Sequence, residues 1–266
     1  MKRIRRPSKT AKNKSPHLSL IIITMVLIII ILLIAINPFY MQQNNSKNGL
    51  LSLTFDDGLL AHYEVVYPLM KERGINGTAF ILANFSGLFE NQELMSFEQA
   101  RKMQDSGWEI GSHTLDHKLL TILPDNKLEN ELQNSKKILE AHGFNIYSIA
   151  YPFGYQNEKV IEKAKKYYSI GRPMKWGYNL PNKIAPYLLS SKWIKEENSP
   201  EEVCSWIKKA KEENLWLILD FHYIGKEKRS NWDVPLSNFE KILDCVSSSG
   251  INVKTIKEVI ENQILT

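Results

Sequence analysis

Hydrophobic and polar positions divide this chain of 266 residues into distinct parts. Residues 18–36 form an apolar run without a charge, in which only Ser19 and Thr24 are polar. From Leu50 onward, short apolar runs typical of buried strands alternate with longer stretches whose apolar residues recur every three or four positions. The second spacing is that of a helix with one buried face. Residues 41–49 are mostly polar, and we interpret them as part of a linker.

The alternation of strand and helix predicts the fold class. The expected strands cover residues 50–55, 77–82, 108–112, 148–151, 168–171, 188–193, 216–221 and 251–255. The expected helices cover residues 63–73, 96–106, 126–142, 157–167, 200–214 and 236–248. Strands separated by helices of this length pair in parallel, so we expect an α/β fold. About seven or eight such units favour a barrel over an open sheet, with the active site at the carboxyl ends of the strands.

The apolar run predicts a membrane anchor. Its 19 residues, as a helix, would span roughly 28 Å, close to the hydrocarbon thickness of a bilayer. A cleaved signal peptide is the alternative, but its apolar core is usually about 7–15 residues long, and no A-x-A site follows here. Seven basic residues precede the run, which places the amino terminus in the cytoplasm. We therefore expect a basic cytoplasmic tail (1–17), a single-pass anchor in the cell membrane (18–36), a linker (37–49) and an extracellular domain (50–266).

The distribution of charge argues against nucleic acid as a partner. The chain has 34 basic and 29 acidic residues, but eight of the basic residues and none of the acidic ones lie in residues 1–50. Residues 51–266 hold the other 26 basic residues and all 29 acidic ones, a net charge of −3. A domain that binds phosphates should itself be basic. The two cysteines, Cys204 and Cys245, exclude a disulfide scaffold and a Cys-rich zinc module, and leave one disulfide between them open.

Two adjacent carboxylates, Asp56 and Asp57, follow the first expected strand and precede Gly58. An Asp-Gly pair is also common in hairpin turns, although the helical pattern that follows makes a hairpin less favoured here. A phosphatase would need two aspartates one residue apart, and these are contiguous. Adjacent carboxylates at a strand end are costly unless a cation lies beside them.

Histidines follow two other expected strands. His113 and His117 come after residues 108–112, and His222 comes after residues 216–221. Two imidazoles four residues apart can bind one metal, but on spacing alone a structural role is equally favoured. A lone core histidine is the alternative for His222. We expect His62 and His142 to be solvated or to cap helices.

These strand ends together form a set suited to metal-assisted hydrolysis. One carboxylate and two histidines can bind a metal, the second carboxylate can act as a base, and the third histidine as an acid. The turn after residues 148–151, Tyr151-Pro152-Phe153-Gly154-Tyr155, lies at the same edge. By itself it is also typical of an ordinary strand-to-helix loop.

At this point the chain resembles the polysaccharide deacetylase family, also called the NodB-homology domain or carbohydrate esterase family 4. The resemblance covers roughly residues 50–260. Its segments are Thr54-Phe-Asp-Asp-Gly58, Ser112-His-Thr-Leu-Asp-His117, Tyr151-Pro-Phe-Gly154 and Leu217-Ile-Leu-Asp-Phe-His222, in the family's order. The closing segment, Phe239-Glu and Gly250-Ile-Asn-Val-Lys-Thr-Ile256, is also similar.

The resemblance implies a distorted (β/α) barrel of about seven parallel strands, here preceded by one transmembrane helix. It implies an enzyme that removes N- or O-acetyl groups from a sugar polymer and that depends on a divalent metal, typically Zn²⁺. The implied roles are general base for Asp56, metal ligands for Asp57, His113 and His117, general acid for His222, and backbone oxyanion donor for Phe153. The expected substrate contacts are Tyr151, Pro152, Tyr155, Arg172 and Trp176.

Two positions depart from the family's pattern. Many members have an Arg, which orients the base, where this chain has Ala150, and Arg172 is the candidate replacement. Many also have an Asp-Trp pair beside the acidic His. Residues 170–185 contain Trp176 but no Asp, so Asp220 and Asp233 are the candidates for the Asp of this pair.

Two other functions compete with a deacetylase. A non-catalytic glycan-binding protein on the same fold would have lost the base or the acid, whereas Asp56 and His222 are both present. A glycosidase would need Asp56 and Asp57 to flank one glycosidic bond at roughly 5 Å or more, and neighbouring strand residues point to opposite faces.

Overall fold

The computed structural model of the protein describes residues 25–26, 49–84, 87–226 and 230–264. The chain divides into two units, residues 1–47 and residues 48–266. In the first unit only Met25 and Val26 are described, and both are helical. The rest of the predicted tail and anchor, and all of the predicted linker except Gly49, lie outside the described residues. Within the described ranges, no helix is both long and apolar enough to cross a bilayer.

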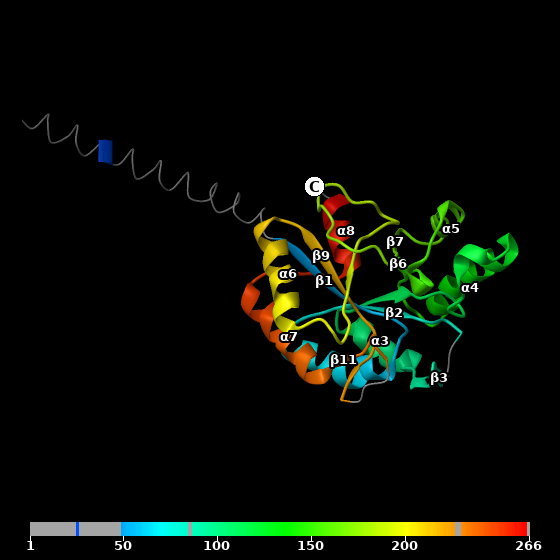
Figure 1. Cartoon of the computed structure of the whole chain (residues 1–266). Coiled ribbons are helices and arrows are strands. Elements are labelled where there is room, and N and C mark those ends of the chain that lie inside the picture. Colours follow the sequence, from blue (N-terminus) through cyan, green and yellow to red (C-terminus); the bar gives the residue numbers. More distant parts are fainter. Residues whose placement is uncertain (1–24, 27–48, 85–86, 227–229, 265–266) are drawn as a thin grey trace, which may run out of the picture. The chain divides into compact units, whose positions relative to one another are not determined.

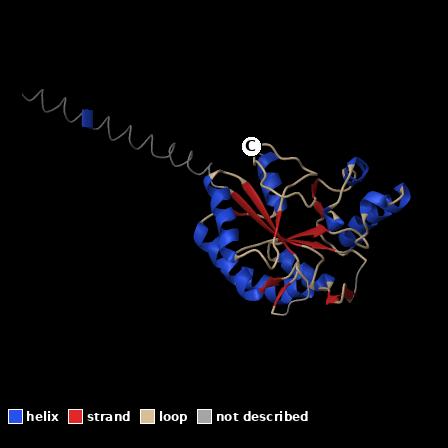
Figure 2. Ribbon diagram, in the orientation of Figure 1, coloured by secondary structure: helices blue, strands red, loops and turns tan. Residues whose placement is uncertain are grey.

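A sheet of parallel strands forms the centre of the second unit, with helices around it (Figures 1 and 2). Its strands follow the order β7–β6–β5–β2–β1–β9–β8, and β12 pairs with the start of β1. The bounds are β1 Leu50–Phe55, β2 Thr78–Ile81, β5 Glu109–Ser112, β6 Ser148–Ala150, β7 Ile170–Arg172, β8 Lys192–Trp193, β9 Trp216–Phe221 and β12 Asn252–Val253. All pairings in this sheet are parallel, as the alternating pattern predicted.

The sheet is a half-barrel of seven parallel strands, which agrees with the predicted distorted (β/α) barrel and shows where it is distorted. Strands β7 and β8 form the two ends of the sheet order and do not pair with each other. The chain between them, residues 173–191, includes Pro173, Pro181 and Pro186. Since proline has no N–H to donate to a strand ladder, this stretch cannot complete a regular barrel.

The helices agree with the predicted spacing, apart from small shifts at their ends. They are α2 Tyr67–Glu72, α3 Phe97–Asp105, α4 Asp125–Ala141, α5 Glu158–Ala164, α6 Pro200–Glu212, α7 Leu236–Ser249 and α8 Ile256–Ile264. Short helical turns are the π-helix η1 (His62–Val66) and the 3-10 helices η2 (Leu120–Ile122) and η3 (Pro152–Gly154). The sequence did not predict α8 or the hairpin of β3 (Leu88–Phe89) and β4 (Gln92–Glu93). A further small ladder joins β10 (Ile224–Gly225) to β11 (Val234–Pro235).

The side chains of β9 alternate between two hydrophobic clusters, and this alternation determines the face on which Asp220 lies. Leu217, Leu219 and Phe221 belong to the large hydrophobic cluster that includes residues of α6 and α7. Trp216 and Ile218 belong instead to a smaller cluster that includes residues of α8. Asp220 continues the second series, so the alternation places its carboxylate on the same face as these two side chains.

A disulfide joins the two helices α6 and α7. Cys204 and Cys245 are bonded, with their Cα atoms 5.9 Å apart. The pairing that the sequence left open is therefore formed in this structure.

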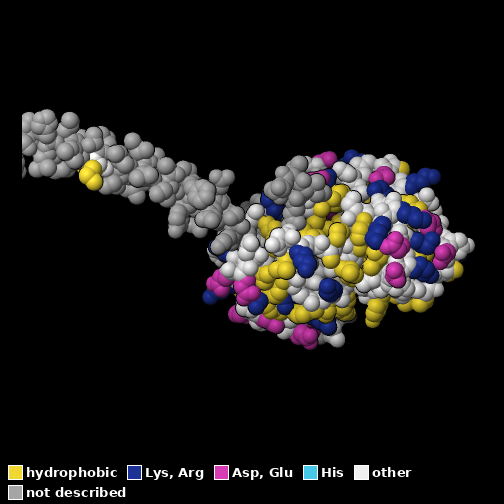
Figure 3. Space-filling view, turned by 90° about the horizontal axis from the view of Figure 1, so that it is seen from above, with side chains coloured by type: hydrophobic (Ala, Val, Ile, Leu, Met, Phe, Trp, Pro, Cys, Tyr) yellow, Lys and Arg dark blue, Asp and Glu magenta, His cyan; other side chains and the backbone are white. Residues whose placement is uncertain are grey.

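The face seen in Figure 3 carries Lys and Arg side chains interspersed with Asp and Glu side chains, and hydrophobic side chains gather over its middle. The mixture of signs on this face agrees with the small net charge of residues 51–266.

Candidate active site

A cavity of about 580 Å³ lies at the carboxyl ends of β1, β5, β6, β7 and β9. Nine of the eleven predicted site residues line it: Asp56, Asp57, His113, His117, Tyr151, Phe153, Tyr155, Arg172 and His222. Pro152 and Trp176 are the two that do not. Residues far apart in the sequence therefore meet at one edge of the sheet, as the strand-end argument predicted.

Asp56 and Asp57 both line this cavity, although they are adjacent in the chain. The argument that neighbouring strand residues point to opposite faces fails here because Asp57 leaves the strand conformation, with φ at 71°. Asp57 Oδ1 lies 3.4 Å from His113 Nε2 and 3.6 Å from His117 Nε2. Asp56 instead contacts Arg172. Each carboxylate thus has its own set of partners.

A compact loop after β5 brings His113 and His117 together. Thr114 and His117 both adopt positive φ values, 71° and 54°. The loop is held by hydrogen bonds from Thr114 N to Ser112 Oγ (3.1 Å) and from His117 N to Thr114 Oγ1 (3.2 Å). Non-glycine residues in this region are strained, and such strain concentrates at functional sites.

Asp57, His113 and His117 offer a three-ligand site for a metal ion. Their ligand atoms all lie within 4.8 Å of one another. Asp57 Oδ1 is buried and lacks a hydrogen bond within the described part of the chain, so that a buried acceptor is left for a cation. His113 Nδ1 lies 2.9 Å from the Ala150 carbonyl oxygen. Because a carbonyl only accepts, Nδ1 donates and Nε2 is left to bind, which is the usual arrangement of a metal-binding histidine.

The protonation of these groups also suits a cation. Burial and then the neighbouring His113 lower the pKa of His117 to about 4, so that its imidazole is neutral at pH 7, as a metal ligand must be. Burial alone would raise the pKa of Asp57, but the imidazole of His113, 3.4 Å away, and the other nearby histidines hold it well below its usual value. Burial would lower the pKa of His113, yet Asp56 and Asp57 raise it. The carboxylates thus favour positive charge at this position.

Arg172 connects two buried carboxylates. Its Nη2 lies 2.5 Å from Asp56 Oδ2 and its Nη1 lies 2.7 Å from Asp220 Oδ2. The side chain is 3% exposed, and the guanidinium also lies over the Phe80 ring, 5.3 Å from its centroid. Arg172 and Ala150 are directly paired in the ladder of β7 and β6. The guanidinium therefore comes from the strand next to Ala150, at the same level of the sheet.

This network keeps Asp56 ionised. Burial would raise the pKa of Asp56, but the Arg172 guanidinium, and then His113 and His222, lower it below its usual value. Burial raises the pKa of Asp220 to about 6, against the opposing effect of Arg172 and with the help of Asp56. Of the two carboxylates that share Arg172, Asp56 therefore has the lower pKa and is the more completely ionised at neutral pH.

The turn after β6 places backbone at the cavity. Phe153 adopts a φ of 59°, and its ring lies 4.6 Å from that of His117. Gly154 also has a positive φ, 70°, and a Cβ at this position would collide with the Met174 side chain. The turn thus requires a glycine where the family's motif has one.

His222 lies at the end of β9 and is partly buried. Its Nδ1 is buried and has no hydrogen-bond partner among the described residues, and its ring lies 5.4 Å from that of Trp232. Asp220 pairs with Arg172, and Asp233 accepts hydrogen bonds from Ser230 N and Oγ. The indole ring of Trp232 thus lies beside this imidazole.

His62 contradicts its prediction. It was expected to be solvated or to cap a helix, but it is fully buried in η1, with Nε2 2.7 Å from the His222 carbonyl oxygen. Burial lowers the pKa of His62 to about 4, so the ring is neutral and donates this hydrogen bond through Nε2. Its place in the helical pattern gave no sign of the contact, which depends on β9, 160 residues away.

Trp176 lies outside the lining of the cavity and is 45% exposed. Its ring packs against Trp193 at 4.7 Å, and Lys192 Nζ lies 4.1 Å from its centroid. The sequence did not indicate the hairpin residues Phe89, Glu90 and Gln92, which line the cavity. The sequence analysis named Arg172 and Asp220 separately but did not predict that they form an ion pair. The charge of Asp220 within the apolar strand β9 was the one sign that it has a buried partner.

Comparison with known proteins agrees with this geometry. Residues 43–168 match the family described as Polysaccharide deacetylase. The Bacillus subtilis protein YxkH is 32% identical over 119 residues, which are 43% of this chain and 40% of that protein. A poly-beta-1,6-N-acetyl-D-glucosamine N-deacetylase of Staphylococcus aureus is 29% identical over 164 residues, 54% of this chain and 52% of that protein. The chain thus spans about half the length, or less, of these two relatives.

A solved structure supports the fold. The chitin deacetylase of the fungus Colletotrichum lindemuthianum is 17% identical, with a TM-score of 0.55 over 80% of this chain and 88% of that one. This likeness concerns the arrangement of the chain alone. With the match over residues 43–168, it confirms that the chain resembles the polysaccharide deacetylase family, as its four motifs indicated.

Proposed function

We propose that this protein is a metal-dependent hydrolase that removes acetyl groups, chiefly N-acetyl, from an extracellular polysaccharide or cell-wall glycan. One observation carries the proposal: a candidate metal site, an ionised carboxylate held by an arginine, and a strand-end histidine line the same cavity. Hydrolysis of an amide needs these three functions, which are an electrophile, a base and an acid.

Asp57, His113 and His117 would hold the divalent cation, and two imidazoles with one carboxylate suit Zn²⁺. When bound, such a cation polarises an acetyl carbonyl and lowers the pKa of a water molecule. The chain's own residues would then move the protons and hold the substrate.

Asp56 would accept the proton of the attacking water. The contact with Arg172 fixes the direction of this carboxylate and keeps it ionised. On the same cavity, His222 would donate a proton to the departing amine, and the hydrogen bond from His62 fixes the backbone that carries it. The backbone N–H of Phe153 is our candidate for the donor to the oxyanion, since Phe153 lines the cavity in a turn with positive φ.

The relatives guide the choice of substrate. The name of the Staphylococcus aureus relative identifies a polymer of N-acetylglucosamine as its substrate. The cavity wall includes Tyr155, which is 63% exposed, and exposed aromatic faces of this kind stack on sugar rings. A glycan of N-acetylated amino sugars is therefore the substrate class we propose.

The location of the enzyme follows from its amino-terminal sequence. Residues 18–36 would anchor it in the cell membrane, with the basic tail in the cytoplasm and the catalytic domain outside. The Cys204–Cys245 disulfide supports this arrangement, because disulfides persist in oxidising compartments and are rare in the cytosol.

Acetate release by the full-length protein tests the activity. The panel should include poly-β-1,6-N-acetylglucosamine, N-acetylated cell-wall glycan and an O-acetylated polymer, each with chelator and with added zinc. We expect acetate from an N-acetylated glycan, lost on chelation and restored by zinc. Release of reducing ends without acetate would instead indicate a glycosidase.

A further inference from the structure

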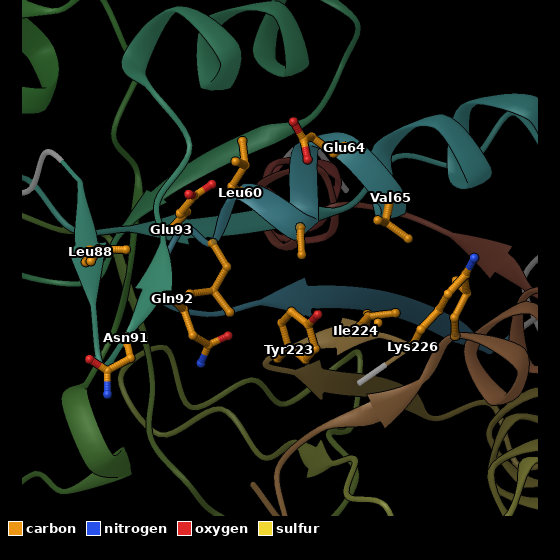
Figure 4. A pocket seen from close by; sticks show the side chains of 14 residues that line it. Leu60, Glu64, Val65, Leu88, Asn91, Gln92, Glu93, Tyr223, Ile224 and Lys226 are labelled. Atoms are coloured by element: carbon orange, nitrogen blue, oxygen red, sulfur yellow. The ribbon is translucent and has the colours of Figure 1, made fainter. Parts of the chain in front are cut away.

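A second cavity lies beside the catalytic one, and Figure 4 shows its walls. It has a volume of about 600 Å³, and we call it the side groove. The β3–β4 hairpin separates the two cavities, and Gln92 lines both of them. Tyr223, the residue after His222, belongs to the wall of the side groove. A polymer with one unit in the catalytic cavity could therefore place a neighbouring unit here.

Two carboxylates on one wall of the side groove have no partner within the described part of the chain. Glu64 comes from η1 and Glu93 from β4, and in Figure 4 they lie on either side of Leu60. Both residues are exposed, and neither forms a hydrogen bond or ion pair with another residue that the structure describes. The described lining also contains one cation, Lys226, which Figure 4 shows on the far side of the groove from Glu93. The two carboxylates outnumber it, so the potential near them is negative and attracts a cation.

The rest of the groove combines apolar surface with an unsatisfied acceptor. Tyr223 and Ile224 lie across the groove from Leu60 (Figure 4). A Cβ at Gly225 would collide with the Tyr223 hydroxyl, so this glycine allows the tyrosine to occupy its place in the wall. Gln92 Oε1, where the two cavities meet, is buried and has no hydrogen-bond partner among the described residues. A buried acceptor without a partner is unusual in a folded protein and is available to a ligand's donor.

We propose that the side groove binds a glucosamine unit, with its free protonated amino group, of the same glycan whose acetamide occupies the catalytic cavity. This inference rests on the proposed function. A glucosaminium unit has an apolar ring face for Tyr223 and Leu60, and a cationic amine for Glu64 and Glu93. Its hydroxyl groups can donate to Gln92 Oε1. The enzyme would accordingly act faster on an acetylated sugar whose neighbour has already lost its acetyl group.

Matched oligomers test this preference in the full-length protein. One N-acetylglucosamine pentamer is fully acetylated, and the other carries a single internal glucosamine. For the unmodified enzyme we expect kcat/KM to be about fivefold to tenfold higher on the second, the size of one or two solvent-accessible ion pairs. The double variant Glu64→Gln with Glu93→Gln should have the same kcat/KM on both pentamers. Glu72→Gln, an exposed carboxylate on α2 outside both cavities, is the control and should keep the preference.

Equal kcat/KM values on the two pentamers would overturn the inference, as would a preference that survives in the double variant. Calorimetry separates this result from a failure of the proposed function. A fully deacetylated glucosamine pentamer should bind the unmodified protein, and the double variant should bind it about fivefold to tenfold more weakly, whether or not acetate is released. Undiminished binding by the double variant would refute the groove's role. Absence of acetate release with this binding intact would refute the hydrolase alone.

Discussion

Replacing Arg172 by Ala should destabilise the protein and slow acetate release together. The guanidinium contacts Asp56 at 2.5 Å and Asp220 at 2.7 Å, and its side chain is 3% exposed. Its loss leaves two buried carboxylates without their cation. Removing one partner of a buried ion pair costs about 3–5 kcal/mol. For a domain of this size that is roughly a 10 °C fall in Tm.

The same change should shift the pH dependence of the reaction. Burial would raise the pKa of Asp56, but Arg172, the largest opposing effect, acts together with His113 and His222 and holds it below its usual value. Without Arg172 burial dominates, so the pKa of Asp56 rises. Since the base must be ionised, the acid limb of the kcat/KM profile should move to higher pH. In the unmodified protein the depressed pKa of Asp56 contributes stability at neutral pH, and this stability is lost as the pH falls through that pKa. In the variant, where burial raises this pKa, ionisation of Asp56 should instead destabilise the folded protein at neutral pH.

A second variant distinguishes the guanidinium's position from its mere presence. Ala150 is the ladder partner of Arg172, and adjacent strands lie about 4.8 Å apart. The double change Ala150→Arg with Arg172→Ala should therefore recover part of the lost Tm and activity, because an Arg from β6 can reach the same carboxylates. Thermal unfolding and acetate release on the three proteins provide the measurement. An Arg172→Ala protein with unchanged Tm and unchanged pH profile would refute this reasoning.

Three further predictions concern the metal, the disulfide and the membrane. His113→Ala should lose stoichiometric zinc and remain folded, and metal analysis with circular dichroism checks both; full zinc content would contradict the assignment. Replacing Cys204 and Cys245 by Ser should lower the free energy of unfolding by up to about 4 kcal/mol, from the entropy of a loop with a sequence separation of 41, and chemical denaturation measures it; no change would show that the bond does not stabilise the fold. Protease added to intact cells should digest residues 50–266, whereas protection until lysis would contradict the external location.

The local pattern of the sequence was sufficient for the strands and for the motif residues. The strands β1 and β9 have the predicted bounds because both are buried apolar runs, and the local sequence is enough to identify such runs. Asp57, His113 and His117 follow the ends of β1 and β5, so that parallel pairing brings them to the same edge of the sheet. The positive φ values of Asp57 and His117 then complete the cluster, and the strand pattern did not predict them.

Contacts between distant segments could not be predicted from the local sequence pattern. His62 sits in a helical pattern, and only the packing of η1 against the end of β9 buries it. Arg172 was a candidate partner for Asp56, but the sequence gave no register for β7 against β6, and that register brings the guanidinium into line with Ala150. The open edge between β7 and β8 depends on a long irregular segment, for which strand and helix periodicity carry no signal.

The adjacent aspartates provide the most direct test of the proposed mechanism. Asp56→Asn keeps the shape and polarity of the side chain but cannot accept a proton, so the protein should retain its zinc and release acetate about 10²–10⁴-fold more slowly. Asp57→Asn replaces an anionic ligand by a neutral amide, so zinc binding should weaken, with activity partly restored at high zinc concentration. Zinc content and acetate release are measured side by side for both variants. Loss of zinc in Asp56→Asn would show that the two roles are exchanged, and near-normal turnover in that variant would contradict the mechanism itself.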